Sequence, residues 1–520
     1  MKQNSGARMN SPKMSLKDLL GEEYIQSVSG ARGLLFGVNA GEYARFGAEQ
    51  IEFFPEAFQE RLDSLLETVG KQVVKPLPDD VPGAGTNSFR EATMVGASPL
   101  SALGFIRIGE DGKGYLTSKS EHYHASLGHS FPGYQLVDRA RTLGIPNATH
   151  NNTRGYITRK LEQELVCAAN GIALEDEQAL RAALASREPH VLNRVINLET
   201  GSLAVEAAVK MMLARFYRPE ETSDQPSYSG RVPVFLVLAD WEGGKRANYH
   251  GTTMFTQFMR GMWPELAARM ADNAIFEVQP VRINDLEHFR QTLEKYDQAP
   301  YKVAGFMHEI VLMNYGGILV DRDYLLQAYQ LCHQHDVPVM VDEIQSCMWS
   351  PEFFLFREYG LRPDFVSIGK GFPGGEFPAS RILATYAYDN LSQFGALVTN
   401  GQEELASLAY LVTMEFLRAN QRQVVELGEY YHQRLRSLVE RYPEKIQTIE
   451  GTRHLSTIFF YRAEEAITFA KELNSKGIDI SLQTYKASCP PAVLTKIPLI
   501  SSPAMVDFLI RKMDETLEAL

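Results

Sequence analysis

Two stretches, "DVPVMVDEIQSC" (336–347) and "FVSIGKGFPGG" (365–375), carry most of the information about the fold of this chain. Each begins as an apolar run typical of a strand buried on both faces. The first run ends in Asp342 and Glu343, and the second ends in Lys370. Burying a carboxylate or an ammonium group without a partner is strongly unfavourable. We therefore expect Asp342 and Lys370 to meet each other or a bound charged group.

The chain around these stretches alternates between apolar strands and amphipathic helices. A helical pattern occupies 321–335. Such alternation indicates an α/β fold with a largely parallel sheet covered on both faces. Ligands of these sheets collect at the carboxyl ends of the strands, which is where Asp342 and Lys370 stand. The strands expected beyond about residue 190 are 232–239, 301–311, 337–344, 364–369 and 381–388.

The two ends of the chain follow other patterns. Residues 1–14 are polar and expected to be disordered, and the pattern from Leu16 to about Val74 is mostly helical. A Pro- and Gly-rich linker at 75–88 precedes a predicted β-hairpin at 104–118. From about residue 405, a long helical run, a short strand at 455–462 and a last helix predict a C-terminal α+β domain.

Composition excludes several classes of protein. A chain of 520 residues exceeds what one hydrophobic core usually serves, so two or more domains are expected. The net charge of −12 argues against nucleic acid as the main partner. The four cysteines form no CxxC pair, which fits a reduced compartment and gives no support to a structural zinc site; no metal is expected. Without a signal-peptide pattern or an apolar run of about 18 residues, we expect a soluble, cytoplasmic protein with no membrane partner.

The lysine and the aspartate suggest a specific chemistry. A lysine desolvated at a strand end has a lowered pKa, and its neutral amine attacks aldehydes to form Schiff bases. An aspartate on the adjacent strand could pair with a protonated ring nitrogen, the arrangement that pyridoxal phosphate requires as an electron sink. An ordinary salt bridge remains the alternative for either residue.

A phosphate site favours the cofactor hypothesis. The stretch "NLETGSLAVEAAVKMMLARF" (197–216) places Thr200, Gly201 and Ser202 directly before an Ala-rich helix. A Gly-Ser turn at a helix N-terminus offers unpaired backbone N–H groups and the positive end of the helix dipole to a phosphate. In isolation the same motif would be a plain capped helix.

In combination, these motifs resemble the class III pyridoxal-phosphate aminotransferases. The resemblance rests on "TGSLAVEAAVK", "YHGTT", "VDEIQ", "GKGFPGG" and "VTNGQEELA", in that order, and it covers about residues 95–465. It implies the aspartate aminotransferase-like fold, fold type I. It also implies a division of the chain into a helical extension with linker (1–94), the first part of a small domain (95–150), a large cofactor-binding domain (151–404) and the rest of the small domain (405–520).

The resemblance also implies catalytic roles. Lys370 would form the internal aldimine and later shuttle a proton, and Asp342 would keep the pyridine nitrogen protonated. Ile344 would pack against the ring, Gln345 would bind the 3′ oxygen, and Tyr249 would stack on the other face.

The phosphate would be shared between two chains. Gly201 and Ser202 would bind it from one chain. Thr399 matches a threonine that the family donates to the neighbouring subunit, which implies a homodimer or a higher oligomer.

The chain departs from the family pattern where substrate carboxylates bind. Glu309 matches the first residue of the family's Glu-Pro loop, but Ile310 replaces the proline. Glu450 stands where an arginine would clamp the α-carboxylate, and Arg453 is the nearest substitute, so glutamate as donor is in doubt. We predict ping-pong transfer of an amino group from an amine or amino acid to an oxo acid or aldehyde. An aminomutase, a racemase and a non-catalytic binding protein of the same fold remain alternatives.

Overall fold

The computed structural model describes residues 8–92, 98–119, 125–147, 153–239, 248–484 and 489–520. Its centre is a seven-stranded sheet in the order β6-β14-β13-β12-β9-β7-β8. Neighbouring strands are parallel except for β14, which is antiparallel to both β13 and β6. This confirms the predicted α/β class. The strands are β6 (Leu192–Leu198), β7 (Val232–Ala239), β8 (Glu277–Arg282), β9 (Tyr301–His308), β12 (Val339–Asp342), β13 (Phe365–Ile368) and β14 (Ser380–Thr385).

Two hydrophobic clusters cover the two faces of this sheet, and the pleat divides the strand residues between them. On β7, Phe235 and Val237 belong to one cluster, while Val234, Leu236 and Leu238 belong to the other. The first cluster includes α9 (Gly201–Leu213) and α10 (Met254–Met259), with α11 (Pro264–Asp272) against its edge. Helices of the second cluster are α7 (Tyr156–Asn170), α12 (Leu286–Tyr296), α13 (Arg322–Gln334), α14 (Leu355–Tyr359) and α16 (Glu404–Arg441).

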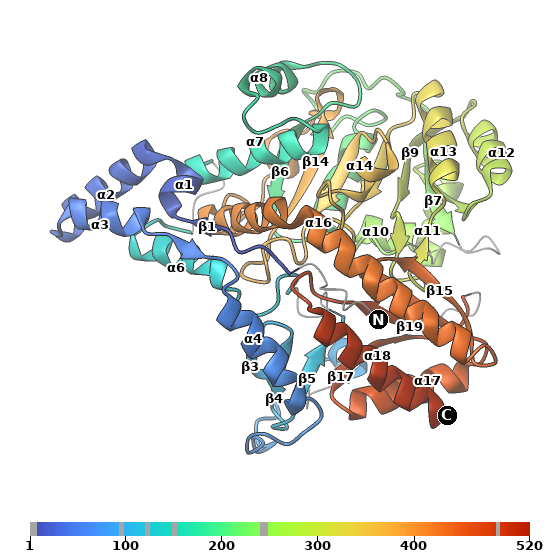
Figure 1. The fold of residues 1–520 in the computed structure, drawn as a ribbon. Helices are drawn as coiled ribbons and strands as arrows, with labels where there is room; N and C mark the ends of the chain where they lie inside the picture. Colours follow the sequence, from blue (N-terminus) through green and yellow to red (C-terminus); the bar gives the residue numbers. More distant parts are fainter. Residues whose placement is uncertain (1–7, 93–97, 120–124, 148–152, 240–247, 485–488) are drawn as a thin grey trace.

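Two four-stranded sheets lie away from the large one, beside α17 (Ala463–Ser475) and α18 (Pro503–Glu518) (Figure 1). One has the order β17-β5-β4-β3 and joins strands from both ends of the chain. Its members are β3 (Pro99–Leu103), β4 (Ile106–Gly109), β5 (Gly114–Thr117) and β17 (Ile478–Asp479). The other consists of β15 (Ile446–Thr452), β16 (Leu455–Phe460), β18 (Ser481–Gln483) and β19 (Ala492–Lys496). The predicted hairpin at 104–118 is the antiparallel pair of β4 and β5.

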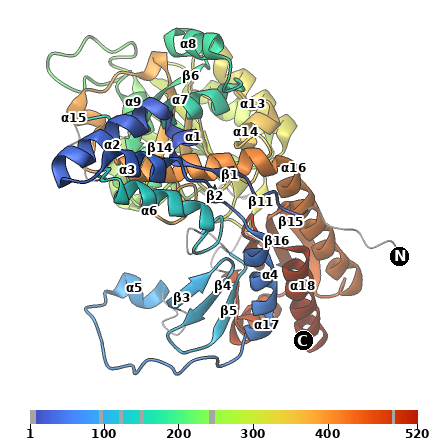
Figure 2. The same cartoon turned by 60° about the vertical axis from the view of Figure 1, so that its left-hand side comes forward.

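The N-terminal region is helical, as expected, but its first described residues are ordered. The helices are α1 (Leu16–Leu20), α2 (Glu22–Phe36), α3 (Ala40–Ala48) and α4 (Glu56–Leu65), and α5 (Asn87–Ala92) and α6 (Gln135–Thr142) follow (Figure 2). Strand β1 (Lys13–Met14) pairs with β2 (Ile51–Glu52). Asn10 exchanges hydrogen bonds with Asn420, where α16 is kinked. The prediction of disorder was therefore wrong for residues 8–14, because these contacts hold the segment.

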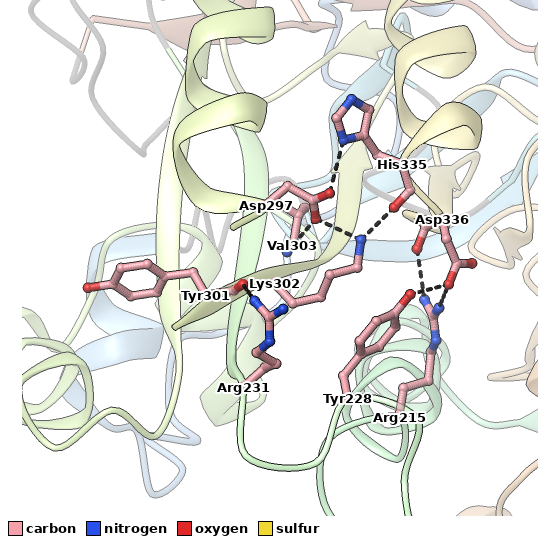
Figure 3. Close-up of polar contacts among 9 residues, drawn as sticks. All are labelled: Arg215, Tyr228, Arg231, Asp297, Tyr301, Lys302, Val303, His335 and Asp336. Atoms are coloured by element: carbon pink, nitrogen blue, oxygen red, sulfur yellow. Dashed lines mark hydrogen bonds and ion pairs between the residues drawn. The ribbon is translucent and has the colours of Figure 1, made fainter. Parts of the chain in front are cut away.

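A polar cluster fixes the loops at the amino ends of β7 and β9 (Figure 3). Lys302 is buried; its ammonium group lies 2.7 Å from Asp297 Oδ1 and also donates to the His335 carbonyl. Beside it, Arg215 pairs with Asp336. This cluster lies across the sheet from the strand ends that carry Asp342 and Lys370.

Candidate active site

The structure brings Asp342 and Lys370 to one cavity at the carboxyl edge of the sheet. Strands β12 and β13 are parallel neighbours with Asp342 opposite Ser367, so Lys370 follows within three residues of that pair. The cavity has a volume of about 230 Å³. Its lining comprises Glu199, Thr200, Gly201, Ser202, Tyr249, His250, Gly251, Glu309, Asn314, Asp342, Ile344, Gln345, Lys370, Phe377, Pro378 and Ala379.

Asp342 is held as a charged carboxylate. Its Oδ1 accepts hydrogen bonds from the Ser367 hydroxyl (2.7 Å) and the Ile344 backbone N–H (3.1 Å), and its Oδ2 lies 2.8 Å from His250 Nδ1. Burial alone would raise the pKa of Asp342, but His250 outweighs it, with help from Ser367, and the pKa is lowered. Two carboxylate oxygens can accept about four hydrogen bonds, so three partners leave room for one more donor.

His250 completes a buried charged pair with Asp342. Burial opposes its protonation, yet the hydrogen bond and charge of Asp342 raise the pKa of His250. The Nδ1 contact orients the Asp342 carboxylate, and Nε2 is buried without a hydrogen-bond partner.

Glu309 is the second acidic group in the cavity wall. Burial, and then the charge of Asp342, raises the pKa of Glu309 to about 7. Its Oε1 accepts a long hydrogen bond from the Tyr249 N–H (3.4 Å), and its Oε2 is buried without a partner. Single ligand atoms of His250, Glu309 and Asp342 lie within 4.8 Å of one another, and His250 and Asp342 pair with each other.

The N-terminus of α9 forms the opposite wall. Thr200 is its N-cap residue and makes no side-chain cap bond, so the first N–H groups of the helix face the cavity without that partner. The Ser202 hydroxyl accepts from the Thr252 N–H at 3.0 Å. Gly251 has φ +132°, and a Cβ there would lie 2.5 Å from Ser202 Oγ. The glycine therefore keeps open a cradle of the kind that a phosphate occupies.

Side chains of the expected ring-binding type line the space between these walls. The Ile344 side chain lies against Gly201, since a Cβ added to Gly201 would be 2.8 Å from Ile344 Cδ1. The Arg260 guanidinium lies 4.9 Å from the centroid of the Tyr249 ring. Lys370 adopts φ +53°, a left-handed conformation that is costly for a lysine and typical of functional sites.

Gln345 has a partner that the sequence did not suggest. The buried Lys496 lies with its ammonium group 3.2 Å from Gln345 Oε1 and 4.1 Å from the centre of the Trp349 ring. A lysine can only donate, so Oε1 is turned to Lys496, which leaves the Gln345 amide nitrogen for a different acceptor.

Two of the predicted residues lie outside this cavity. Thr399 is exposed and does not line the cavity of its own chain. Arg453 is engaged with Glu358 through both terminal nitrogens, and Glu450 is likewise absent from the lining. Gly201, Ser202, Tyr249, Glu309, Asp342, Ile344, Gln345 and Lys370 are brought together.

Sequence reasoning missed other parts of the site. The cavity is also lined by Glu199, Asn314 and the segment Phe377–Ala379. In addition, the Ser367 hydroxyl donates a hydrogen bond to Asp342. Ser367 could have been found from the alternation of β13, because it faces the same side as the residue opposite it on β12. Glu343 takes no part in the cavity, because its carboxylate accepts hydrogen bonds from the Phe356 N–H (2.6 Å) and the Ser346 hydroxyl.

Comparisons with known proteins show the family of the chain. The family described as aminotransferase class-III matches residues 110–516. A putrescine aminotransferase of Pectobacterium atrosepticum is 26% identical over 360 residues, 66% of this chain and 71% of that protein. An acetylornithine aminotransferase of Methanocaldococcus jannaschii is 24% identical over 404 residues, 74% of this chain and 90% of that protein.

Solved structures show the same fold. An amine transaminase from an uncultivated Pseudomonas species, in its PLP-bound form, has a TM-score of 0.65 at 17% identity and covers 86% of this chain and all of its own (100%). A transaminase from the marine bacterium Virgibacillus has a TM-score of 0.64 at 15% identity, covering 88% and 98% of the two chains.

The fold and the site define a pyridoxal-phosphate enzyme of fold type I. The chain belongs to the class-III aminotransferases, which confirms the predicted resemblance. It is a transaminase that moves amino groups from a donor to an oxo acceptor with pyridoxal phosphate as cofactor. The aminomutase, racemase and non-catalytic alternatives are not favoured. Within the described ranges, no helix is both long and apolar enough to cross a bilayer.

Proposed function

We propose that Lys370 and Asp342 carry the amino-group transfer of this enzyme. The observation behind the proposal is that both side chains, from adjacent strand ends, line the same cavity as the N-terminus of α9. Pyridoxal phosphate supplies an aldehyde that bonds amines and a protonated ring that withdraws electrons from them. The residues present fit this group, because the cavity offers a lysine, a charged carboxylate and an anion cradle.

Each residue then has a definite task. Lys370 would hold the cofactor through Nζ, and Nζ would move a proton to or from the substrate carbon. Asp342 would keep a proton at the ring nitrogen through the acceptor position that Ser367, Ile344 and His250 leave open. Donor and acceptor use this one lysine in turn, as in a ping-pong mechanism.

The remaining wall residues bind and orient the cofactor. Gly201 and Ser202 hold the phosphate at the start of α9. Ile344 and Tyr249 enclose the ring. The Gln345 amide nitrogen donates to the ring's 3′ oxygen, and Lys496 keeps the amide in that orientation through its bond to Oε1.

The cavity favours a donor with a second amino group over one with a second carboxylate. Among the described residues that line it, none is an arginine, whereas Glu199 and Glu309 both contribute carboxyl groups. Arg453 is held by Glu358, so it supplies no bidentate clamp unless that pair opens. Diamine and diamino-acid donors, such as those named for the putrescine and ornithine aminotransferases among its relatives, suit this charge pattern.

We also propose that the enzyme is a cytoplasmic homodimer with shared sites. Thr399 is exposed near Phe394, whose side chain is 92% exposed in the single chain. A large apolar side chain this exposed suits a subunit interface. The phosphate-binding site would then be completed by Thr399 of the partner subunit. The four free, buried cysteines suit a reducing compartment. The division into an extension (1–94), a small domain (95–150 and 405–520) and a large domain (151–404) stays part of this proposal.

The test of the catalytic assignment is the visible spectrum of purified protein loaded with pyridoxal phosphate. Putrescine, ornithine, acetylornithine and glutamate are added separately, and Lys370→Ala is compared with Lys471→Ala on the exposed side of α17. We expect a yellow protein that the diamino donors bleach, an unchanged Lys471→Ala variant, and no bleaching in Lys370→Ala. Normal bleaching of Lys370→Ala would refute the assignment. Faster bleaching by glutamate than by either diamino donor would refute the donor class.

The test of the shared site uses mixed dimers. Lys370→Ala and Thr399→Ala variants are unfolded, mixed and refolded together. If the site is shared, each mixed dimer regains one intact site, and activity exceeds the sum of the separate variants. A monomeric mass in light scattering, or no gain on mixing, would contradict the shared site.

A further inference from the structure

A second cluster of metal-binding side chains lies at the amino edge of the large sheet. It contains His190, two residues before β6; His333, in the last turn of α13; and Asp364, directly before β13. One ligand atom from each lies within 4.8 Å of the other two. Strand β13 separates the cluster from Lys370, because Asp364 precedes that strand and Lys370 follows it. The cluster is therefore distinct from the cofactor cavity.

The distances in this cluster suit a coordinated ion. His190 Nδ1 lies 3.1 Å from Asp364 Oδ1. Two ligands bound to one tetrahedral zinc ion at about 2.0–2.1 Å lie roughly 3.3 Å apart. The His190 and His333 rings are stacked with centroids 3.9 Å apart and an angle of 28° between their planes. The ligand atom of His333 lies within 4.8 Å of those of His190 and Asp364.

A backbone contact outside the cluster orients Asp364. Its Oδ2 accepts the Val339 N–H at 2.9 Å, and its Oδ1 faces His190 Nδ1. His190 itself adopts φ +62°, a left-handed conformation. Metal ligands are commonly held in this way by backbone groups and carboxylates around them.

One buried polar atom of the cluster lacks a hydrogen-bond partner when no ligand is bound. His333 Nε2 is buried and has no hydrogen-bond partner. A buried polar atom without a partner costs about 1–3 kcal/mol, and a metal ion would satisfy it.

Two cavities border the cluster. One of about 590 Å³ is lined by His190, and another of about 400 Å³ is lined by His333. Leu361 and Arg362 line both cavities. An ion bound by three side chains can then complete its coordination with water. The positive charge of Arg362 opposes the ion, and the Asp364 carboxylate offsets it.

We propose that His190, His333 and Asp364 form a binding site for one divalent transition-metal ion, with zinc as the expected occupant. Two imidazoles and a carboxylate are a ligand set that zinc favours over magnesium or calcium. The ion joins the loop before β6, the end of α13 and the start of β13. Its role is structural, and the proposal does not depend on the reaction in the cofactor cavity.

The test is metal binding by the full-length protein loaded with pyridoxal phosphate and stripped by a chelator. Cobalt(II) chloride is the probe because its visible absorption reports the ligands, and zinc chloride is the competitor. We expect one equivalent of cobalt that zinc displaces. His190→Ala and His333→Ala should each lower the affinity more than about tenfold. His288→Ala, which removes a histidine from α12, should leave it unchanged.

The outcomes separate the proposal from its alternatives. Uptake that is equal in wild type and in the His190→Ala/His333→Ala double variant would overturn the site. If the variants fail to fold, X-ray absorption of the cobalt-loaded wild type still identifies the ligand atoms of the ion. Two imidazole ligands would support the site, and sulfur ligation would overturn it by placing the ion on cysteines. Unchanged aminotransfer in the single variants would support the separation from the cofactor cavity, and lost cofactor absorption would contradict it.

Discussion

Replacing Lys302 by methionine should destabilise the protein without changing its chemistry. The ammonium group of Lys302 neutralises Asp297 in a place where their side chains are only 8% and 11% exposed. Methionine keeps most of the volume but leaves the carboxylate without its cation. Removing one partner of a buried ion pair costs about 3–5 kcal/mol. Since the Val303 N–H and His335 Nδ1 still contact Asp297, we expect the lower end of that range, about 3 kcal/mol.

The assay is thermal unfolding of the loaded protein, followed by circular dichroism, with Lys471→Met as the exposed control. The double variant Lys302→Met/Asp297→Asn removes both charges and should be more stable than the sum of the single effects by about 1–3 kcal/mol. The cofactor spectrum should not change, because the cluster lies at the opposite strand ends from Lys370. A Lys302→Met variant as stable as the control, or a double variant worse than the sum, would refute the reasoning.

Three further perturbations follow from the site. Burial raises the pKa of Glu343 from 4.5 to about 7, so the folded state holds the proton that the unfolded state releases, and stability falls between pH 4.5 and 7. In Glu343→Gln, the decrease in the free energy of unfolding over this pH range should be smaller by about 3 kcal/mol. Equal pH profiles of wild type and variant in urea unfolding would contradict this. Gly251→Ala should weaken binding of pyridoxal phosphate more than about tenfold in fluorescence titrations, because the added Cβ would collide with the start of α9. Gly30→Ala is the control and should not weaken binding, since the space around Gly30 is open. Lys496→Met should release the Gln345 amide and shift the pH at which the bound cofactor changes colour; an unchanged spectral titration would argue against this positioning role.

The central strands were predictable because they are buried on both faces. The predicted strand 232–239 is β7 to the residue, and the runs that end in Asp342 and Lys370 became neighbours in the sheet. Apolar runs without alternation have few other interpretations when helices lie between them. The edge strands β6 and β8 were not predicted, since "LNRVINL" and "EVQPVR" interrupt their apolar residues with polar ones. The antiparallel direction of β14 was not predictable either, because strand direction leaves no mark in composition.

The cofactor cavity was predictable for a related reason. Asp342, Ile344, Gln345 and Lys370 lie within 29 positions of one another, at or just past the ends of two neighbouring strands, so their order alone places them together. The partners of these residues come from farther away. Lys496 reaches Gln345 from β19, and Glu358 takes up Arg453 across 95 positions. Such pairings depend on how the C-terminal sheet meets the large domain, and no periodicity in the sequence encodes that.

The proposed metal site shows the same contrast at the opposite edge of one sheet. His190, His333 and Asp364 meet because the chain enters β6, leaves α13 and enters β13 at that edge, and no spacing rule for metal ligands spans such distances in the sequence. Parallel strands place all their carboxyl ends on one side and all their amino ends on the other, so one sheet can support two sites that share strands but no ligand. Strand β13 links them, with Asp364 at its start and Lys370 just past its end. Zinc should therefore raise the unfolding temperature of the wild type and not of His333→Ala, while leaving the rate of aminotransfer unchanged in both.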